Sequence, residues 1–62
     1  MAGEGMEVKI ARLRVGLKQY ELAAEIGINA TALSEMESGR RTISPEIARK
    51  IALVLEKYQK EA

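Results

Sequence analysis

Two short helical patterns between residues 17 and 41 are separated by only three residues, Gly27, Ile28 and Asn29. Apolar residues at helical spacing predict one helix over about residues 19–25, with Ile26 still on its inward face, and the next over residues 30–37. Gly27 can adopt the left-handed backbone that ends a helix, the Asn29 side chain can cap the helix that follows, and Gly39 can close that helix. A corner this tight predicts either a helix-turn-helix or an ordinary hairpin of a helical bundle.

The segment before this corner carries a further helical pattern. Val8, Ile10, Leu13 and Leu17 recur near helical spacing, so a first helix is expected to end near Val15. Residues 1–6 include two glycines and show no periodicity. They are expected to form a flexible N-terminal tail, which leaves residues 7–62 as a single domain.

A strong start signal precedes the last helical pattern, because Ser44 is a good N-cap and Pro45 suits the first helical position. The pattern that follows predicts the longest helix, and its apolar stripe consists of Ile47, Ile51, Val54, Leu55 and Tyr58. No strand pattern and no internal repeat are found. The sequence therefore predicts an all-α fold, a compact bundle of four to five helices.

Composition excludes several classes of function. The chain has 62 residues, enough for one core, and it contains no Cys and no His. Disulfides and the usual zinc ligand sets are therefore ruled out, and we expect no metal and no cofactor. Because Asp is also missing, catalysis is not expected. No apolar run approaches the length of a membrane span and no signal peptide is recognised, so we expect a cytoplasmic protein without membrane contact.

Two motifs resemble a known family over about residues 8–55. The segment 'GLKQYELAAEIG' is similar to the Gly-Leu-Ser/Thr-Gln-x-x-Leu-Ala pattern of the phage repressor and Cro family, also called the Xre family, and 'LSEMESGRR' resembles the end of its recognition helix. The resemblance implies a lambda-repressor-like fold. It also implies sequence-specific binding of double-stranded DNA by a small transcriptional regulator of the repressor type, with residues 30–37 in the major groove.

The resemblance further implies which side chains meet DNA. The base-reading candidates are Asn29, Ala30, Thr31, Ser34 and Glu35. The phosphate candidates are Lys18, Gln19, Arg40, Arg41 and Thr42. Gln19 opens a helix, and free N–H groups at a helix N-terminus favour an anion.

Three positions depart from the family pattern. Lys18 replaces the usual capping residue and cannot accept a hydrogen bond, although Glu21 can reach back to the helix start and the Lys18 ammonium can meet a phosphate. Ala30 offers a base only apolar contact, for example with a thymine methyl group. Glu35 either accepts from a cytosine amino group or points aside, and the sequence leaves both alternatives open.

Two structural roles are also expected. Arg12 and Glu37 resemble the family's pair that joins the first helix to the end of the third, the alternative being two independent surface charges. Two copies would double the DNA contacts, so we expect a homodimer. Its candidate contacts are Val54, Leu55 and Tyr58, which could instead complete the core of one copy.

A different class of function stays open beside DNA binding. The segment 'ISPEIARKIA' resembles a variant seen in some antitoxins of this family. Because one fold serves many functions, the alternative is an antitoxin or protein-interaction module with a toxin partner. Salt-dependent binding to duplex DNA would discriminate between the two.

Overall fold

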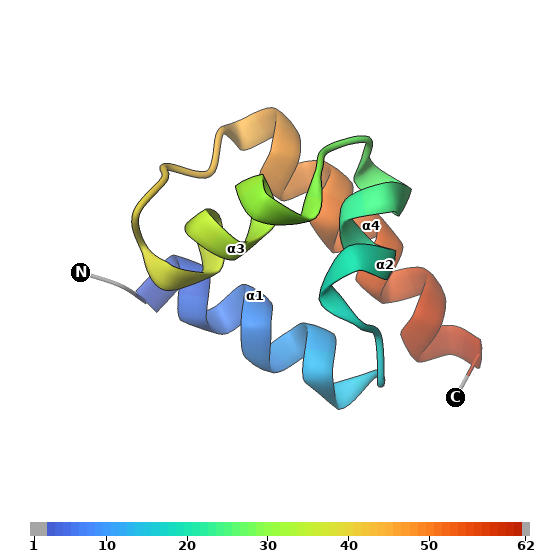
Figure 1. The fold of residues 1–62 in the computed structure, drawn as a ribbon. Helices are drawn as coiled ribbons and strands as arrows, with labels where there is room; N and C mark the ends of the chain where they lie inside the picture. Colours follow the sequence, from blue (N-terminus) through green and yellow to red (C-terminus); the bar gives the residue numbers. More distant parts are fainter. Residues whose placement is uncertain (1–2, 62) are drawn as a thin grey trace.

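The computed structural model describes residues 3–61, and the side chains of residues 4–59. These residues form helices α1 (Gly3–Arg14), α2 (Gln19–Ile26), α3 (Ala30–Ser38) and α4 (Pro45–Glu61), and no strand occurs among them (Figure 1). The predicted all-α fold is confirmed, and α4 is the longest helix as expected. Within this part of the chain, no helix combines the length and apolar composition needed to cross a membrane.

The ends of α2, α3 and α4 are made by the residues that the sequence indicated. Gly27 ends α2 with φ of 81° and Gly39 ends α3 with φ of 87°, in the left-handed region that favours glycine. The Asn29 side chain accepts a hydrogen bond of 2.7 Å from the Ala32 N–H. The Ser44 hydroxyl oxygen accepts from the N–H of Ile47 at 3.2 Å. Local chemistry therefore fixes the corner between α2 and α3.

The core lies where α2, α3 and α4 meet, and Leu22 and Leu33 are fully buried at its centre. Its members are Leu17, Leu22, Ala23, Ile26, Leu33, Met36, Ile43, Ile51 and Leu55. Leu55 is only 7% exposed, so it belongs to the core of one copy. A contribution of Leu55 to a dimer contact stays a prediction. Val54 and Tyr58 are partly buried and pack against the same core.

Helix α1 begins earlier than expected. It starts at Gly3, so the predicted tail is wrong for residues 3–6, whereas residues 1–2 lie outside the described residues. Gly5 is buried, and a Cβ atom at this position would overlap the Met36 carbonyl oxygen of α3. Glycine is thus required here by the close approach of two helices, a cause that local periodicity does not reveal.

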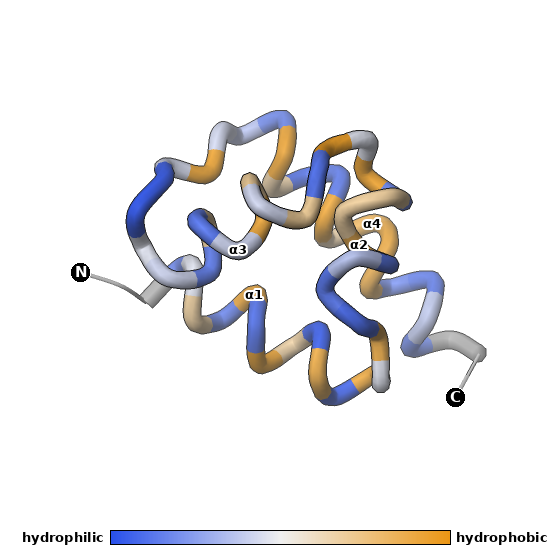
Figure 2. The backbone as a smooth tube through the Cα atoms, viewed as in Figure 1, coloured by the Kyte–Doolittle hydropathy of each residue, from blue (hydrophilic) through white to orange (hydrophobic). Residues whose placement is uncertain are grey.

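The buried face of α1 also differs from the apolar pattern in the sequence. Ile10 and Leu13 are 44% and 58% exposed. The residues of α1 that are buried or partly buried are Gly5, Val8, Ala11, Arg12 and Val15. Glycine, alanine, valine and one arginine therefore cover the core, while Ile10 and Leu13 face outward. Figure 2 shows hydrophobic and hydrophilic residues in alternation along α1.

Polar contacts tie α2 to α4. The Tyr58 hydroxyl donates to Glu25 Oε2 at 2.8 Å, and Lys57 Nζ lies 3.5 Å from Glu25 Oε1. The hydrogen bond from Tyr58 and then the positive charge of Lys57 lower the pKa of the Glu25 carboxyl below its ordinary value of 4.5. The outer ends of the two helices are thus held by a small polar cluster.

We expect this cluster to contribute stability that depends on pH. Because the pKa is lowered in the folded state, the carboxylate stabilises the fold above about pH 4.5, and the contribution is lost as the pH falls through the folded-state pKa. Glu25→Gln should therefore be less stable than the parent near neutral pH, with the difference shrinking below about pH 4.5. Urea unfolding across this range measures it, and Tyr58→Phe should reproduce part of the change. Parallel stability profiles for parent and Glu25→Gln would contradict the expectation.

Candidate nucleic-acid interface

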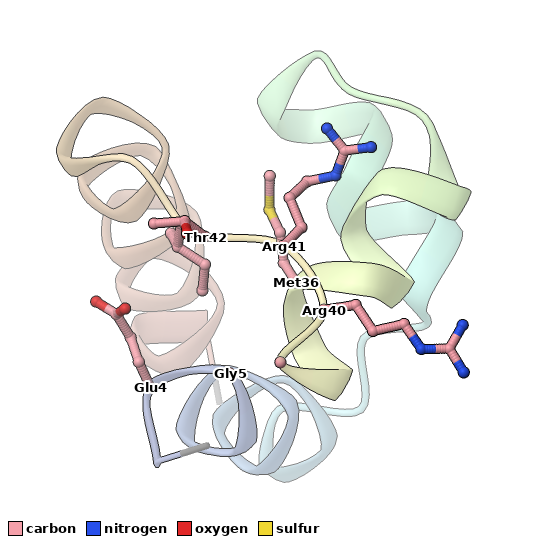
Figure 3. A pocket seen from close by; sticks show the side chains of 8 residues that line it. Glu4, Gly5, Met36, Arg40, Arg41 and Thr42 are labelled. Carbon is pink, nitrogen blue, oxygen red and sulfur yellow. The ribbon is translucent and has the colours of Figure 1, made fainter. Parts of the chain in front are cut away.

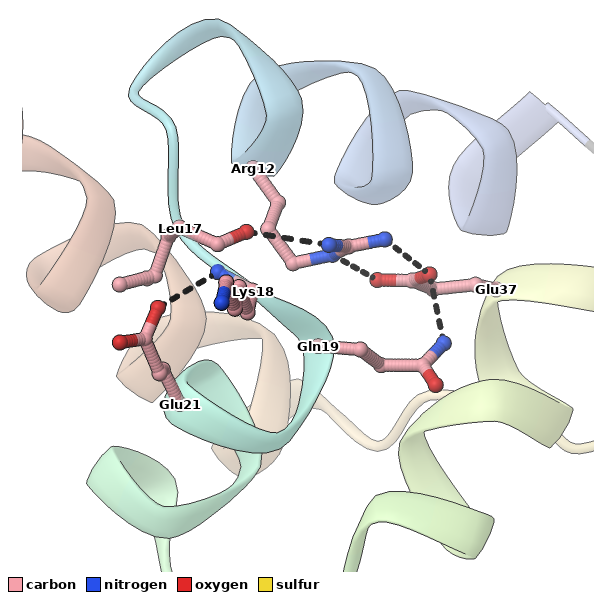
Figure 4. Close-up of polar contacts among 6 residues, drawn as sticks. All are labelled: Arg12, Leu17, Lys18, Gln19, Glu21 and Glu37. Atoms are coloured by element: carbon pink, nitrogen blue, oxygen red, sulfur yellow. Dashed lines mark hydrogen bonds and ion pairs between the residues drawn. The ribbon is translucent and has the colours of Figure 1, made fainter.

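A buried ion pair joins α1 to the end of α3 (Figure 4). Arg12 Nε and Nη2 donate to the two carboxylate oxygens of Glu37 at 2.8 and 3.0 Å, and Arg12 Nη1 donates to the Leu17 carbonyl oxygen at 3.0 Å. Gln19 Nε2 donates to Glu37 Oε1 at 3.1 Å. The predicted pair of Arg12 and Glu37 is confirmed, and the alternative of two independent surface charges is excluded by their burial.

This network fixes the geometry of three helices at one point. Arg12 comes from α1, Gln19 from the first position of α2, and Glu37 from the last turn of α3. Among the described residues, no buried side-chain nitrogen or oxygen lacks a hydrogen-bond partner. Buried pairs add little net stability, but their bond geometry is directional. The network therefore sets the angle at which α3 leaves the core and holds Gln19 beside it.

The start of α2 has only one of the two side-chain hydrogen bonds that form a capping box. Lys18 occupies the N-cap position and its side chain has no oxygen to accept a bond. Glu21 Oε1 instead accepts from the Lys18 N–H at 2.8 Å, as the sequence suggested. The Lys18 side chain is exposed, so its ammonium group is free of a capping role.

The outer face of α3 carries small polar groups. Thr31 and Ser34 are exposed, so both hydroxyl groups face solvent. Asn29 is also exposed, but its side-chain oxygen caps α3. Ala30 is partly buried against the core. Of the base-reading candidates, Thr31 and Ser34 are thus the most accessible.

Glu35 turns away from this face and towards the residues after α3. Arg41 Nε and Nη2 donate to Glu35 Oε1 at 2.9 and 2.7 Å. Of the two alternatives left open for Glu35, the structure has the carboxylate pointing aside. Arg41 is therefore neutralised within the chain, whereas Arg40 is exposed and makes no ion pair among the described residues.

The loop after α3 separates the two arginine side chains. Figure 3 shows their guanidinium groups pointing in different directions beside a hollow of about 200 Å³. The exposed residue Thr42 lies at the edge of this hollow. Arg40 and Arg41, although adjacent in sequence, consequently present their charges to different parts of the surface.

A second hollow, of about 340 Å³, is lined by residues of α1, α2 and α3 together. It is lined by Lys9, Arg12, Gln19, Ser34, Glu37 and Ser38. Lys9 and Ser38 were not predicted as site residues. A helical wheel could have indicated them, because Lys9 precedes Arg12 by three residues and Ser38 follows Ser34 by four. The hollow combines a lysine, an amide and the Ser34 hydroxyl group, a set that can donate hydrogen bonds to phosphate oxygens. The Ser38 hydroxyl instead donates to the Glu35 carbonyl oxygen at 3.0 Å.

Comparison with known families gives a match to the family model described as Helix-turn-helix, over residues 8–58. No curated protein and no solved structure matches the chain. The matched region contains α2, the corner and α3, and it also contains the buried pair. The predicted family is thereby confirmed, and with it the general function of a DNA-binding regulator. The chain belongs to the helix-turn-helix family of the Xre, Cro and C1 type.

Proposed function

We propose that the protein is a repressor that binds double-stranded DNA sequence-specifically as a homodimer, with α3 in the major groove. One observation carries this proposal: the exposed hydroxyl face of α3 lies beside the N-terminus of α2, and both are fixed by one buried network. A major groove of about 12 Å admits one α-helix. Repression then requires only that the bound protein occupies its operator.

The contacts divide by chemistry. The Thr31 hydroxyl can exchange hydrogen bonds with base edges and its methyl group can contact thymine, while Ser34 adds a second hydroxyl one turn away. On one side, the free N–H groups at the start of α2 favour a phosphate, with Gln19, Lys18 and Lys9 nearby. On the other side, Arg40 supplies a guanidinium group that makes no ion pair with any described residue. Phosphate contacts set the position of α3, and the base contacts provide the specificity.

Two copies are needed because one recognition helix reads too little sequence. Helix α3 has nine residues, which at about 1.5 Å per residue span about four base pairs. The Cα trace measures 31 × 22 × 19 Å, less than the distance of about 34–36 Å between half-sites one helical turn apart. A two-fold dimer would present both recognition helices to one face of the duplex.

The salt dependence of binding should distinguish the two arginines. Arg40→Ala should lower the slope of log affinity against log salt by about 0.9, since one phosphate contact is lost. Arg41→Ala should lower it by less, because Glu35 already neutralises that guanidinium group. In a Glu35→Gln background, Arg41→Ala should then lower the slope by about 0.9 as well. Equal losses for both arginines in the parent background would mean that phosphate displaces Glu35.

Selection of bound duplexes from a random pool tests the proposed function directly. The parent should yield a two-fold symmetric consensus. Thr31→Ala should change that consensus, with a loss of about 1 kcal/mol of discrimination at one base pair. Thr42→Ala is the matched control, because Thr42 lies in the loop after α3 and should at most weaken all duplexes alike. Failure to bind any duplex would overturn the proposal and favour a protein-interaction module.

A further inference from the structure

The outward face of α1 carries an apolar stripe. Met6, Ile10 and Leu13 are 48%, 44% and 58% exposed, and they are three of the five exposed large hydrophobic side chains among the described residues. Their spacing of four and then three residues places them in one line along the helix. In a helix of about 100° per residue, the stripe lies roughly half a turn from the buried face of α1. Exposed apolar residues that gather in this way indicate an interaction surface.

Two charged residues border this stripe on the same flank. Glu7 and Arg14 are seven residues apart, or two helical turns, and both are exposed. Neither makes an ion pair within the described part of the chain. A second α1 running antiparallel across a two-fold axis near Ile10 would place Glu7 opposite Arg14 of the partner subunit, twice. Parallel pairing would instead bring Lys9 towards the partner's Arg14, which has the same sign of charge.

We infer that α1 is the homodimer interface, its stripe packing antiparallel against the same stripe of a second copy. The surface is self-complementary, as a two-fold interface requires, because apolar residues meet at its centre and opposite charges meet along the edge formed by Glu7 and Arg14. The α4 residue Leu53 is 60% exposed but stands alone among charged neighbours, so it provides no comparable stripe. This inference deepens the proposed function, on which its relation to DNA rests.

The position of the stripe also suits DNA binding by both copies. On a helical wheel, the stripe lies about a quarter turn from the direction of Arg12 and Lys9, which line the hollow shared with Gln19 and Ser34. A two-fold axis parallel to that direction would turn both α2–α3 surfaces towards the same side.

Charge exchange at the stripe edge tests the interface without DNA. Sedimentation equilibrium should show a dimer for the parent, and Glu7→Arg or Arg14→Glu alone should weaken it by about tenfold or more, since like charges then face each other. The double variant Glu7→Arg/Arg14→Glu should restore the dimer. Leu13→Glu should abolish it, whereas the matched control Leu53→Glu should have no effect. Because all these positions are exposed, thermal unfolding should confirm that each variant is folded.

Binding to a duplex selected by the parent distinguishes failure of the α1 interface from failure of the proposed DNA-binding function. On a duplex with two half-sites, the parent should bind cooperatively, and the single charge variants should lose cooperativity while retaining their affinity for one half-site. Dimerisation without any duplex binding would overturn the proposed function and leave the interface standing. A parent that stays monomeric alone and binds the two half-sites independently would overturn the interface. A double variant that is not restored would also overturn it.

Discussion

Glu37→Ala should lower the free energy of unfolding by about 3–5 kcal/mol, the largest loss that we expect from a single substitution. Glu37 accepts two hydrogen bonds from Arg12 and one from Gln19, and it is 5% exposed. Its removal leaves the guanidinium group of Arg12 buried, with only the Leu17 carbonyl oxygen still bonded to it. Because small domains have little stability in reserve, urea unfolding should show most of the chain unfolded at low denaturant concentration.

The double variant Arg12→Met/Glu37→Leu tests separately whether this pair stabilises the fold and whether it orients α3 for DNA binding. Replacing both charges by apolar groups of similar size leaves no charge uncompensated, so stability should be close to that of the parent or above it. Specific DNA binding should nevertheless weaken, because α3 loses its directional tie to α1 and Gln19 loses its partner. A double variant as unstable as Glu37→Ala would contradict this view. Unchanged specific binding in the double variant would show that the pair does not orient α3.

Helix ends were predictable because their signals are local. Gly27, Asn29, Gly39 and Ser44 act on backbone groups within a few residues of themselves, and the structure has each of them in the expected role. The core face of α4 followed from spacing alone, since Ile51 and Leu55 are buried. Spacing could not show whether Leu55 is covered by its own chain or by a second copy, because periodicity identifies an apolar face and not what covers it.

Helix α1 was poorly predicted for a related reason. Its larger apolar side chains form the helical pattern in the sequence, yet Ile10 and Leu13 face outward. The face that packs against α3 and α4 includes Gly5, where a Cβ atom would overlap the α3 backbone, and Arg12, which is buried by its pairing with Glu37. The packing of α1 against α3 and α4 shows which of its two apolar faces is buried.

The candidate site was predictable where the family resemblance supplied long-range information. The pair of Arg12 and Glu37 spans 25 residues, which no local pattern could have joined. Glu35 lies in α3 and Arg41 lies in the loop that follows it. The sequence pattern could not show that the Glu35 carboxylate pairs with Arg41 and so points away from the outer face of α3. The roles of Thr31, Ser34 and Arg40 on DNA stay predictions.

Gly5→Ala should destabilise the fold by about 1–3 kcal/mol, because the added methyl group must displace the α3 backbone. A Cβ atom at Gly5 would overlap the Met36 carbonyl oxygen and would lie 3.0 Å from the Glu37 carbonyl oxygen. Both atoms are backbone, so no flexible side chain can move aside. The sign of the change is decisive: a flexible tail would make the substitution neutral, and an exposed helical position would make it stabilising by up to about 1 kcal/mol. Urea unfolding of parent and variant gives the sign directly.

Gly16→Ala is the matched control for this substitution. Gly16 has φ of 72° and a Cβ atom there would meet nothing within 4 Å, so its replacement should cost about 1–2 kcal/mol from backbone strain alone. The two variants should differ in DNA binding under conditions where both are folded. Gly5→Ala displaces the end of α3 that carries Glu37 and should weaken specific binding, whereas Gly16→Ala should leave it unchanged. Equal binding by the two folded variants would mean that the crossing of α1 and α3 stabilises the domain without positioning the recognition helix.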